Sequence, residues 1–149
     1  MSKDQAARYN SNKTKLSMTF PLLTKLESMV SMFGAAKYQA YNWLKGGKAT
    51  TPIDCMMRHL DALRAGEWLD PDSGLPHAAH IRWNAGQITQ WYYAKPGQTT
   101  PPPSQSVLDW DLPVMEYTDQ LAKDIEFAAL KMEAAKEKYA AERKAAGLE

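Results

Sequence analysis

The stretch T-P-I-D-C-M-M-R-H-L-D-A-L-R-A-G-E-W-L-D-P-D-S-G-L-P-H-A-A-H-I-R-W-N, residues 51–84, decides how this chain is organised. It contains all three histidines of the protein and, between them, carboxylates in a turn rich in Gly, Pro and Ser: His59, His77, His80, Glu67, Asp70 and Asp72. Histidines and carboxylates that gather across a short connection between two helices are a common way to build a metal or phosphate site. We therefore expect the functional region to lie in this stretch.

Helix signals stand on both sides of that turn. Thr51 is a natural N-cap, Pro52 suits the first helical turn and Gly66 is a natural end. The apolar positions of this helix predict its buried face: Ile53, Met56, Met57, Leu60 and Leu63. The next helix is expected from about Pro76 to Tyr93. One of its stripes is polar and is expected to face an interior cleft: His77, His80, Asn84, Gln87 and Trp91.

Before this stretch, we expect a helix from Phe20 to Gly34, capped by Thr19, with Pro21 in its first turn. Glu27 lies off its apolar stripe and is either a solvated acid or a residue that faces a site. An aromatic segment follows, whose rings, lysine and amide either hold a base and a phosphate or complete the core: Lys37, Tyr38, Asn42 and Trp43. The polar residues 1–15 are either a solvated terminus or a basic, amide-bearing arm that includes Arg8, Asn10 and Lys13.

After it, the Pro-rich residues 96–116 read as a linker, and residues 117–146 read as a helix. The helix carries a heptad-like apolar seam that requires a partner, either the core or a second chain: Leu121, Ile125, Ala128, Met132, Ala135 and Tyr139. The prediction is an all-α bundle of about four main helices. We expect a core at residues 1–95, the linker at 96–116 and a packing or oligomerising helix at 117–149.

Bulk composition narrows the function classes. A chain of 149 residues that is 44% hydrophobic can bury one core, and a net charge of +1 offers no case for a nucleic-acid polymer as partner. The single cysteine, Cys55, excludes an internal disulfide, and no apolar run predicts a signal peptide or membrane span. We expect a soluble, cytoplasmic protein without a membrane partner.

The turn between the helices offers oxygen ligands. Glu67 and Asp70 in E-W-L-D converge on one ion if the helical turn continues, and Mg²⁺ or Mn²⁺ prefers such carboxylates together with substrate phosphates. Neutral histidine or asparagine nearby then orients water or phosphate. The competing interpretation of these carboxylates is helix capping and turn solvation. The pair His77-x-x-His80 alone is weak support for zinc.

Three motifs occur in order: R-Y-N-S-N-K, F-G-A-A-K-Y-x-x-Y-N-W-x-K-G, and the run from Arg58 to Asn84. Over roughly Arg8 to Tyr93 the chain resembles the phage dATP/dGTP diphosphohydrolases, which are MazG-like all-α nucleotide pyrophosphohydrolases and include MazZ-type enzymes. The resemblance implies hydrolysis of a purine deoxynucleoside triphosphate to monophosphate and pyrophosphate. It also implies Mg²⁺ or Mn²⁺, a homodimer or homotetramer, and adjustment of the nucleotide pool in the host cytoplasm during phage infection.

The resemblance also assigns residues. Those implied for catalysis are Glu67, His77 and His80, and those implied for metal binding are Glu67, Asp70 and His59. Those implied for substrate binding are Arg8, Asn10, Lys13, Lys37, Tyr38, Asn42, Trp43, Arg58 and Asn84. The chain departs from MazG-like enzymes at large because only E-W-L-D matches their paired acidic helices, and it straddles a turn. The alternatives are a pyrophosphohydrolase of another nucleotide and a non-catalytic helical interaction protein.

Overall fold

The computed structural model describes residues 13–95 and 115–148. In chain order the elements are the 3-10 turn η1 (Leu16–Met18), α1 (Pro21–Lys37), the 3-10 turn η2 (Asn42–Lys45), α2 (Thr50–Arg64), α3 (His77–Tyr93) and α4 (Asp119–Ala145). Within these ranges, extended pairing is limited to two single bridges, Leu69 with Pro76 and Ala94 with Tyr117. The predicted all-α fold is confirmed. None of the helices described is long and apolar enough to cross a membrane.

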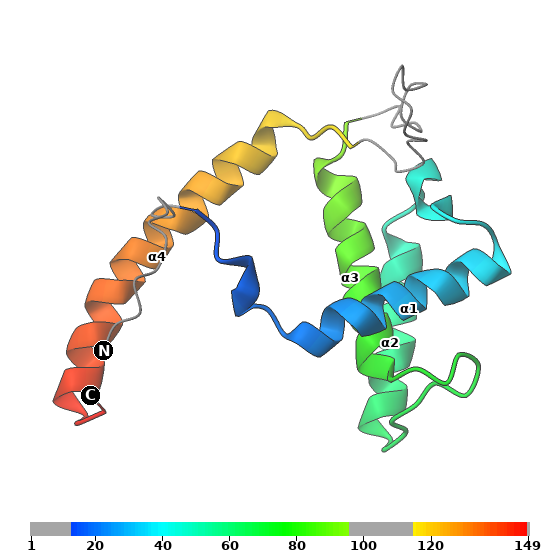
Figure 1. Ribbon diagram of the computed structural model, residues 1–149, viewed down its shortest axis with the longest axis horizontal. Helices are drawn as coiled ribbons and strands as arrows, with labels where there is room; N and C mark the ends of the chain where they lie inside the picture. Colours follow the sequence, from blue (N-terminus) through cyan, green and yellow to red (C-terminus); the bar gives the residue numbers. More distant parts are fainter. Residues whose placement is uncertain (1–12, 96–114, 149) are drawn as a thin grey trace, which may run out of the picture.

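Helices α2 and α3 form a hairpin, and α1 crosses it (Figure 1). Both α1 and α2 pack on α3, so α3 is the central element. The buried apolar core is small: it consists of Val30, Leu75 and Ala79, with Leu26 and Trp83 packed against it. Because Leu75 comes from the α2–α3 loop and Ala79 from the first turn of α3, the core lies directly beside the predicted functional stretch.

One predicted helix end and two predicted N-caps are wrong. Helix α1 continues through Gly34 to Lys37, because a helix interior tolerates one glycine at a cost of about 1 kcal/mol and two alanines follow it. The Thr19 hydroxyl donates to the carbonyl of Leu16 and does not cap α1. Helix α2 begins at Thr50, with Ala49 at the N-cap and no side-chain cap, so Thr51 lies inside the helix. Pro21 and the buried Pro52 do lie in the first turns, as predicted.

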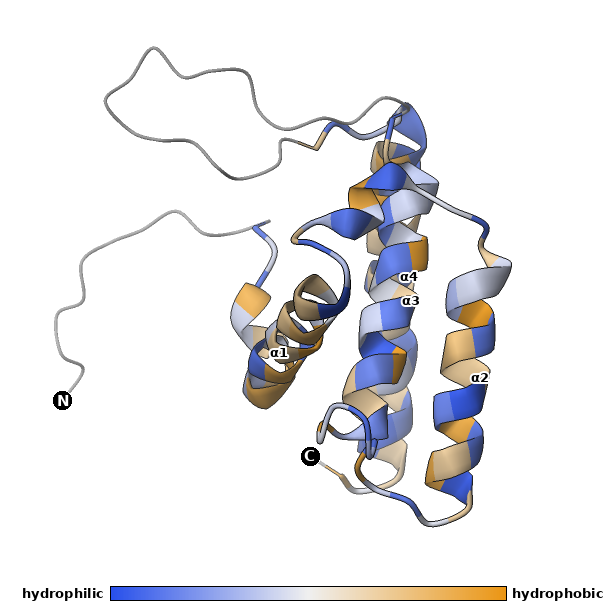
Figure 2. Cartoon of the chain, turned by 90° about the vertical axis from the view of Figure 1, so that its right-hand side faces the viewer, coloured by the Kyte–Doolittle hydropathy of each residue, from blue (hydrophilic) through white to orange (hydrophobic). Residues whose placement is uncertain are grey.

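The predicted buried face of α2 is only partly covered. Met56 and Leu63 are half-buried, whereas Ile53, Met57 and Leu60 are exposed. In Figure 2, α2 stands at the edge of the helical unit, and hydrophobic positions recur along it. The reason is geometric: α3 packs against one side of α2, and no described element covers the other.

Helix α4 is attached at its beginning and otherwise extends away from the other helices (Figure 1). The Tyr93 hydroxyl donates to Asp124 Oδ2 at 2.6 Å, and the amide of Thr118 donates to the carbonyl of Tyr93. No residue of α4 is buried, and the side chains of Ile125 and Met132 in the predicted seam are 60% and 59% exposed. The seam therefore does not pack on the core of this chain.

Candidate active site

The loop between α2 and α3 is held by its own backbone. Gly66, with φ of 92°, follows the end of α2; its amide donates to Leu63, and the amide of Glu67 donates to Ala62. This pairing is the Schellman arrangement, which satisfies the last carbonyls of a helix through a left-handed residue. Further on, the amide of His77 donates to the carbonyl of Trp68 at 3.0 Å. The loop thus closes on itself and brings Glu67 to the first turn of α3.

The first part of the site is a chain of three side chains. His77 Nε2 lies 2.8 Å from Glu67 Oε1, and His77 Nδ1 lies 2.8 Å from His59 Nδ1. A carboxylate only accepts, so Nε2 of His77 carries a proton that it donates to Glu67. In neutral His77 the other nitrogen is then an acceptor, and His59 donates to it from Nδ1. This arrangement leaves Nε2 of His59 with an available lone pair.

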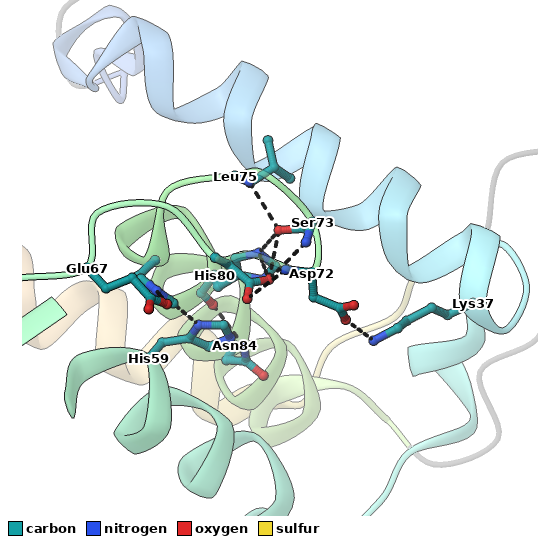
Figure 3. A network of polar contacts seen from close by, with 10 residues as sticks. Lys37, His59, Glu67, Asp72, Ser73, Leu75, His80 and Asn84 are labelled. Atoms are coloured by element: carbon teal, nitrogen blue, oxygen red, sulfur yellow. Dashed lines mark hydrogen bonds and ion pairs between the residues drawn. The ribbon is translucent and has the colours of Figure 1, made fainter. Parts of the chain in front are cut away.

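The second part of the site joins His80 to Asp70 through Ser73. The Ser73 hydroxyl donates to Asp70 Oδ2 at 2.9 Å and lies 2.7 Å from His80 Nε2. Because its single proton goes to the carboxylate, the hydroxyl accepts from His80 and from the backbone amide of Leu75. The rings of His59 and His80 are stacked, with centroids 4.4 Å apart and planes 10° from parallel. Since His59 also contacts His77, the three histidines, here called the histidine cluster, form one contiguous group. Figure 3 shows His59 and His80 within it.

Burial sets the charge of this group. Desolvation lowers the pKa of both His59 and His80, and the neighbouring histidines lower it further. Partial burial by itself raises the pKa of Asp70, but hydrogen bonds from the Ser73 side chain and from the amides of Asp72 and Ser73 outweigh it, and the pKa of Asp70 is lowered. At neutral pH the imidazoles of His59 and His80 are thus neutral and the carboxylate of Asp70 is ionised. A group that accepts protons or orients phosphate requires such charge states.

Two substrate-binding candidates lie around the cluster. Lys37, at the end of α1, pairs with Asp72 Oδ2 at 3.1 Å, and this contact raises the pKa of Lys37 (Figure 3). A permanent cation therefore stands beside the loop that carries Asp70. Asn84 is buried one turn after His80, and its Nδ2 donates to the carbonyl of His80. Its amide group supports the helix that presents the histidine.

The structure does not bring the other candidates to the cluster by a contact. Tyr38 is 72% exposed, and Arg58 is exposed and donates to Cys55 Sγ at 3.2 Å. Lys13 is exposed and Asn42 is half-buried at the start of η2. Arg8 and Asn10 lie outside the described residues.

Trp43 belongs to a different feature, a cavity of about 340 Å³ between α1, η2 and α3. We call this cavity the indole pocket; its lining residues are Glu27, Ser31, Trp43, Trp83, Gly86, Gln87 and Gln90. Of the two interpretations of Glu27, the structure places it in the wall of a cavity. Sequence reasoning missed Ser73 and Trp83. For Ser73 a signal existed, because an Asp in a turn commonly accepts from the backbone of the residues that follow it, and the amide of Ser73 donates to Asp70 Oδ2.

The predicted condition for a shared ion is not met. Helix α2 ends at Arg64, so Glu67 and Asp70 lie on an irregular segment; Glu67 contacts His77 and Asp70 contacts Ser73. Across residues 13–95 and 115–148, no group of three or more His, Cys, Asp or Glu side chains is arranged to hold a metal ion. The described residues therefore do not form a closed metal cage by themselves.

The fold and the site define a class: an all-helical protein with neutral imidazoles and carboxylates at one end of a helical hairpin, and a cation beside them. The family model described as dATP/dGTP diphosphohydrolase, N-terminal, matches residues 3–100. The chain belongs to this family, whose name indicates dATP/dGTP diphosphohydrolase activity and a small-molecule nucleotide substrate. Comparison with curated proteins and with solved structures found no match.

Proposed function

We propose that this protein hydrolyses dATP or dGTP to the deoxynucleoside monophosphate and pyrophosphate at the histidine cluster. The observation that carries the proposal is the hydrogen-bonded chain from Glu67 through His77 to His59, because it leaves one imidazole nitrogen able to take a proton. Family membership supplies the reaction class. The proposal extends to the purine deoxynucleotide pool of a phage-infected cell, as the resemblance to phage enzymes implies.

The roles follow from the contacts. Water attacks one phosphorus of the α–β anhydride, the bridging oxygen leaves with the other phosphorus, and Nε2 of His59 accepts the water proton. Glu67 and His77 hold the ring of His59 in the required tautomer, in the way that a carboxylate orients a catalytic histidine. His80 donates from Nε2 to Ser73 beside Asp70, which leaves its Nδ1 free to accept a hydrogen bond from water at the phosphates. Lys37 offers a charge to the polyphosphate.

Divalent cation dependence is part of the proposal. Mg²⁺ is usually held by one or two carboxylates together with substrate phosphates, and a site of this kind needs no preformed cage. Glu67 and Asp70 are the residues that would hold Mg²⁺ or Mn²⁺, which would neutralise charge on the triphosphate.

The test is a panel of deoxynucleoside and ribonucleoside triphosphates with Mg²⁺, with Mn²⁺ or with EDTA, in which pyrophosphate and phosphate are resolved. Pyrophosphate release from dATP or dGTP that needs the metal and is lost in His59→Gln is the expected result. Asp61→Asn, an exposed change on the same helix, is the matched control. Hydrolysis of another nucleotide only would support the rival substrate class, and no hydrolysis at all would favour an interaction protein.

We also propose that the chain forms a homodimer or homotetramer, with residues 1–95 as the catalytic unit and residues 117–149 as a tie between copies. Exposed apolar side chains on two helices support this: Met57 and Leu60 on α2, and Ile125, Leu130 and Met132 on α4. Soluble monomers rarely leave contiguous apolar faces uncovered. Light scattering of the full chain and of a version ending at Thr99 tests the proposal. A full chain that is monomeric at micromolar concentration refutes it. If both versions associate equally, the interface lies on α2 and not on α4.

A further inference from the structure

The indole pocket has the composition of a site for a flat, polar ring. Two tryptophans, Trp43 from η2 and Trp83 from α3, line it together with Glu27 and Gln87. Its volume of about 340 Å³ falls within the roughly 300–1,000 Å³ range of small-molecule sites. Aromatic walls with a few polar groups are what a nucleobase requires, since its faces stack and its edge makes hydrogen bonds.

The walls of the pocket are fixed before any ligand binds. Trp83 Nε1 donates to Ser31 Oγ at 2.6 Å, which ties α3 to α1. Trp91 Nε1 donates to the backbone carbonyl of Trp43 at 2.8 Å, which ties η2 to α3. The ring of Trp91 also lies against Gly47, where an added Cβ would be 3.0 Å from Cη2. Rigid walls reduce the ordering cost of binding.

Glu27 is held with one oxygen toward the pocket. Its Oε2 pairs with Arg82 Nε at 3.5 Å, and Arg82 is not a lining residue. Its Oε1 lies against Gly86, 3.3 Å from where a Cβ of that residue would stand. Gly86 does line the pocket, so the absence of a side chain there lets the carboxylate approach α3 from α1. Glu27 therefore presents a negative hydrogen-bond acceptor beside the two indoles.

The pocket and the histidine cluster share one helix. Gln87 follows His80 by seven residues on α3, which is about two turns, or ~10 Å along the axis. Both residues belong to the polar stripe of α3. A nucleotide that places its phosphates at the histidine cluster can thus extend along α3 toward the indole pocket.

On these observations, and resting on the function proposed above, we propose that the indole pocket binds the purine base and that Glu27 selects guanine over adenine. Guanine carries two adjacent N–H donors on its Watson–Crick edge, at N1 and at the 2-amino group, and Oε1 of Glu27, which has two lone pairs, can accept from them. Adenine has an acceptor at N1 and no 2-amino group, so it faces the same carboxylate with a lone pair. A hydrogen bond to a charged group is about twice as strong as a neutral one, so selection of at least about tenfold is expected.

The experiment is calorimetric binding of dGMP and dAMP in EDTA. The two ligands carry the same phosphate, so their affinity ratio isolates the base, and neither has an α–β anhydride to hydrolyse. Glu27→Gln should bring the ratio of dissociation constants close to one. Gly86→Ala places a methyl group against Oε1 and should weaken dGMP binding severalfold more than dAMP binding. The matched controls are Gly34→Ala, a helical glycine with nothing within 4 Å, and Glu137→Gln, an exposed residue of α4.

Equal binding of dGMP and dAMP by the unmodified protein overturns the proposal, and so does a ratio that survives both Glu27→Gln and Gly86→Ala. Thermal melts and helicity of each variant are recorded; if Glu27→Gln does not fold, Gly86→Ala decides. The triphosphate panel separates the two proposals. If guanine is preferred through Glu27 but no triphosphate is hydrolysed, the proposal for the pocket stands and the proposed reaction is refuted. If triphosphates are hydrolysed but the base preference is the same in both variants, the proposed reaction stands and the proposal for the pocket is refuted.

Discussion

Glu67→Gln is the substitution that bears most directly on the proposed chemistry. Glutamine keeps a carbonyl oxygen where Glu67 Oε1 accepts from His77 Nε2 at 2.8 Å, so the shape of the contact is retained and its charge is lost. A hydrogen bond to a charged group contributes about 1.5–3 kcal/mol and a neutral one about 1 kcal/mol. The weakened hold on the histidine ring alone therefore costs about 2–30-fold in rate.

The same carboxylate is one of the two proposed to meet the metal ion, which adds to the loss. Changes in groups that only support a metal ligand already cost about 10–100-fold. We therefore expect kcat/KM for dGTP or dATP to fall by at least about 100-fold in Glu67→Gln. The free energy of unfolding should change by less than about 1 kcal/mol, because the Glu67 side chain is 51% exposed and solvent already screens its charge.

The assay is the initial rate of pyrophosphate release at saturating Mg²⁺, with circular dichroism and a thermal melt of the same samples. Glu133→Gln is the control, since Glu133 also accepts a contact, from Lys136 at 2.6 Å, but lies on the exposed face of α4. It should retain the normal rate. Near-normal turnover of Glu67→Gln at saturating Mg²⁺ refutes both roles given to this carboxylate.

Three further predictions concern binding, pH and packing. Lys37→Ala should raise KM severalfold and leave kcat unchanged, because Lys37 is proposed to bind the phosphates. The melting temperature should also stay unchanged, because the ion pair of Lys37 with Asp72 is exposed and stabilises the fold little. Steady-state kinetics and a thermal melt test this prediction, and a loss confined to kcat would contradict it. Burial lowers the pKa of His59 and His80 in the folded protein, so below about pH 6.5 the unfolded state binds more protons than the folded state. The free energy of unfolding should therefore fall as the pH drops from about 6.5 through the folded-state pKa values. Thermal melts in EDTA between pH 8 and 5 should show a falling melting temperature, and a constant melting temperature would contradict the prediction. Gly47→Ala should destabilise by about 1–3 kcal/mol, because its Cβ meets Trp91, whereas Gly34→Ala, in an open helical position, should stabilise by up to about 1 kcal/mol; urea unfolding of both variants measures the difference, and equal midpoints would refute the packing argument.

The sequence by itself determined the helical class and the stretch that carries the candidate site. Apolar spacing and the Gly and Pro residues at the helix ends locate α2, α3 and α4 to within a few residues, because these signals act over one helical turn. The polar stripe on α3 also came from spacing alone, and His77, His80 and Asn84 are indeed buried. Family membership follows from motifs in order along the chain and needs no fold.

Only the tertiary structure decided which groups meet. Nothing in the spacing of residues pairs Ser73 with His80, or joins His59 to Glu67 through the two nitrogens of His77, because these contacts depend on how the loop closes on the helical hairpin. The same holds for the indole pocket, where three elements bring Glu27, Trp43 and Trp83 together. The sequence pattern also did not predict which apolar faces are covered. Periodicity shows that a face needs a partner, but it does not show whether this chain supplies that partner. The exposed sides of α2 and α4 are the physical result.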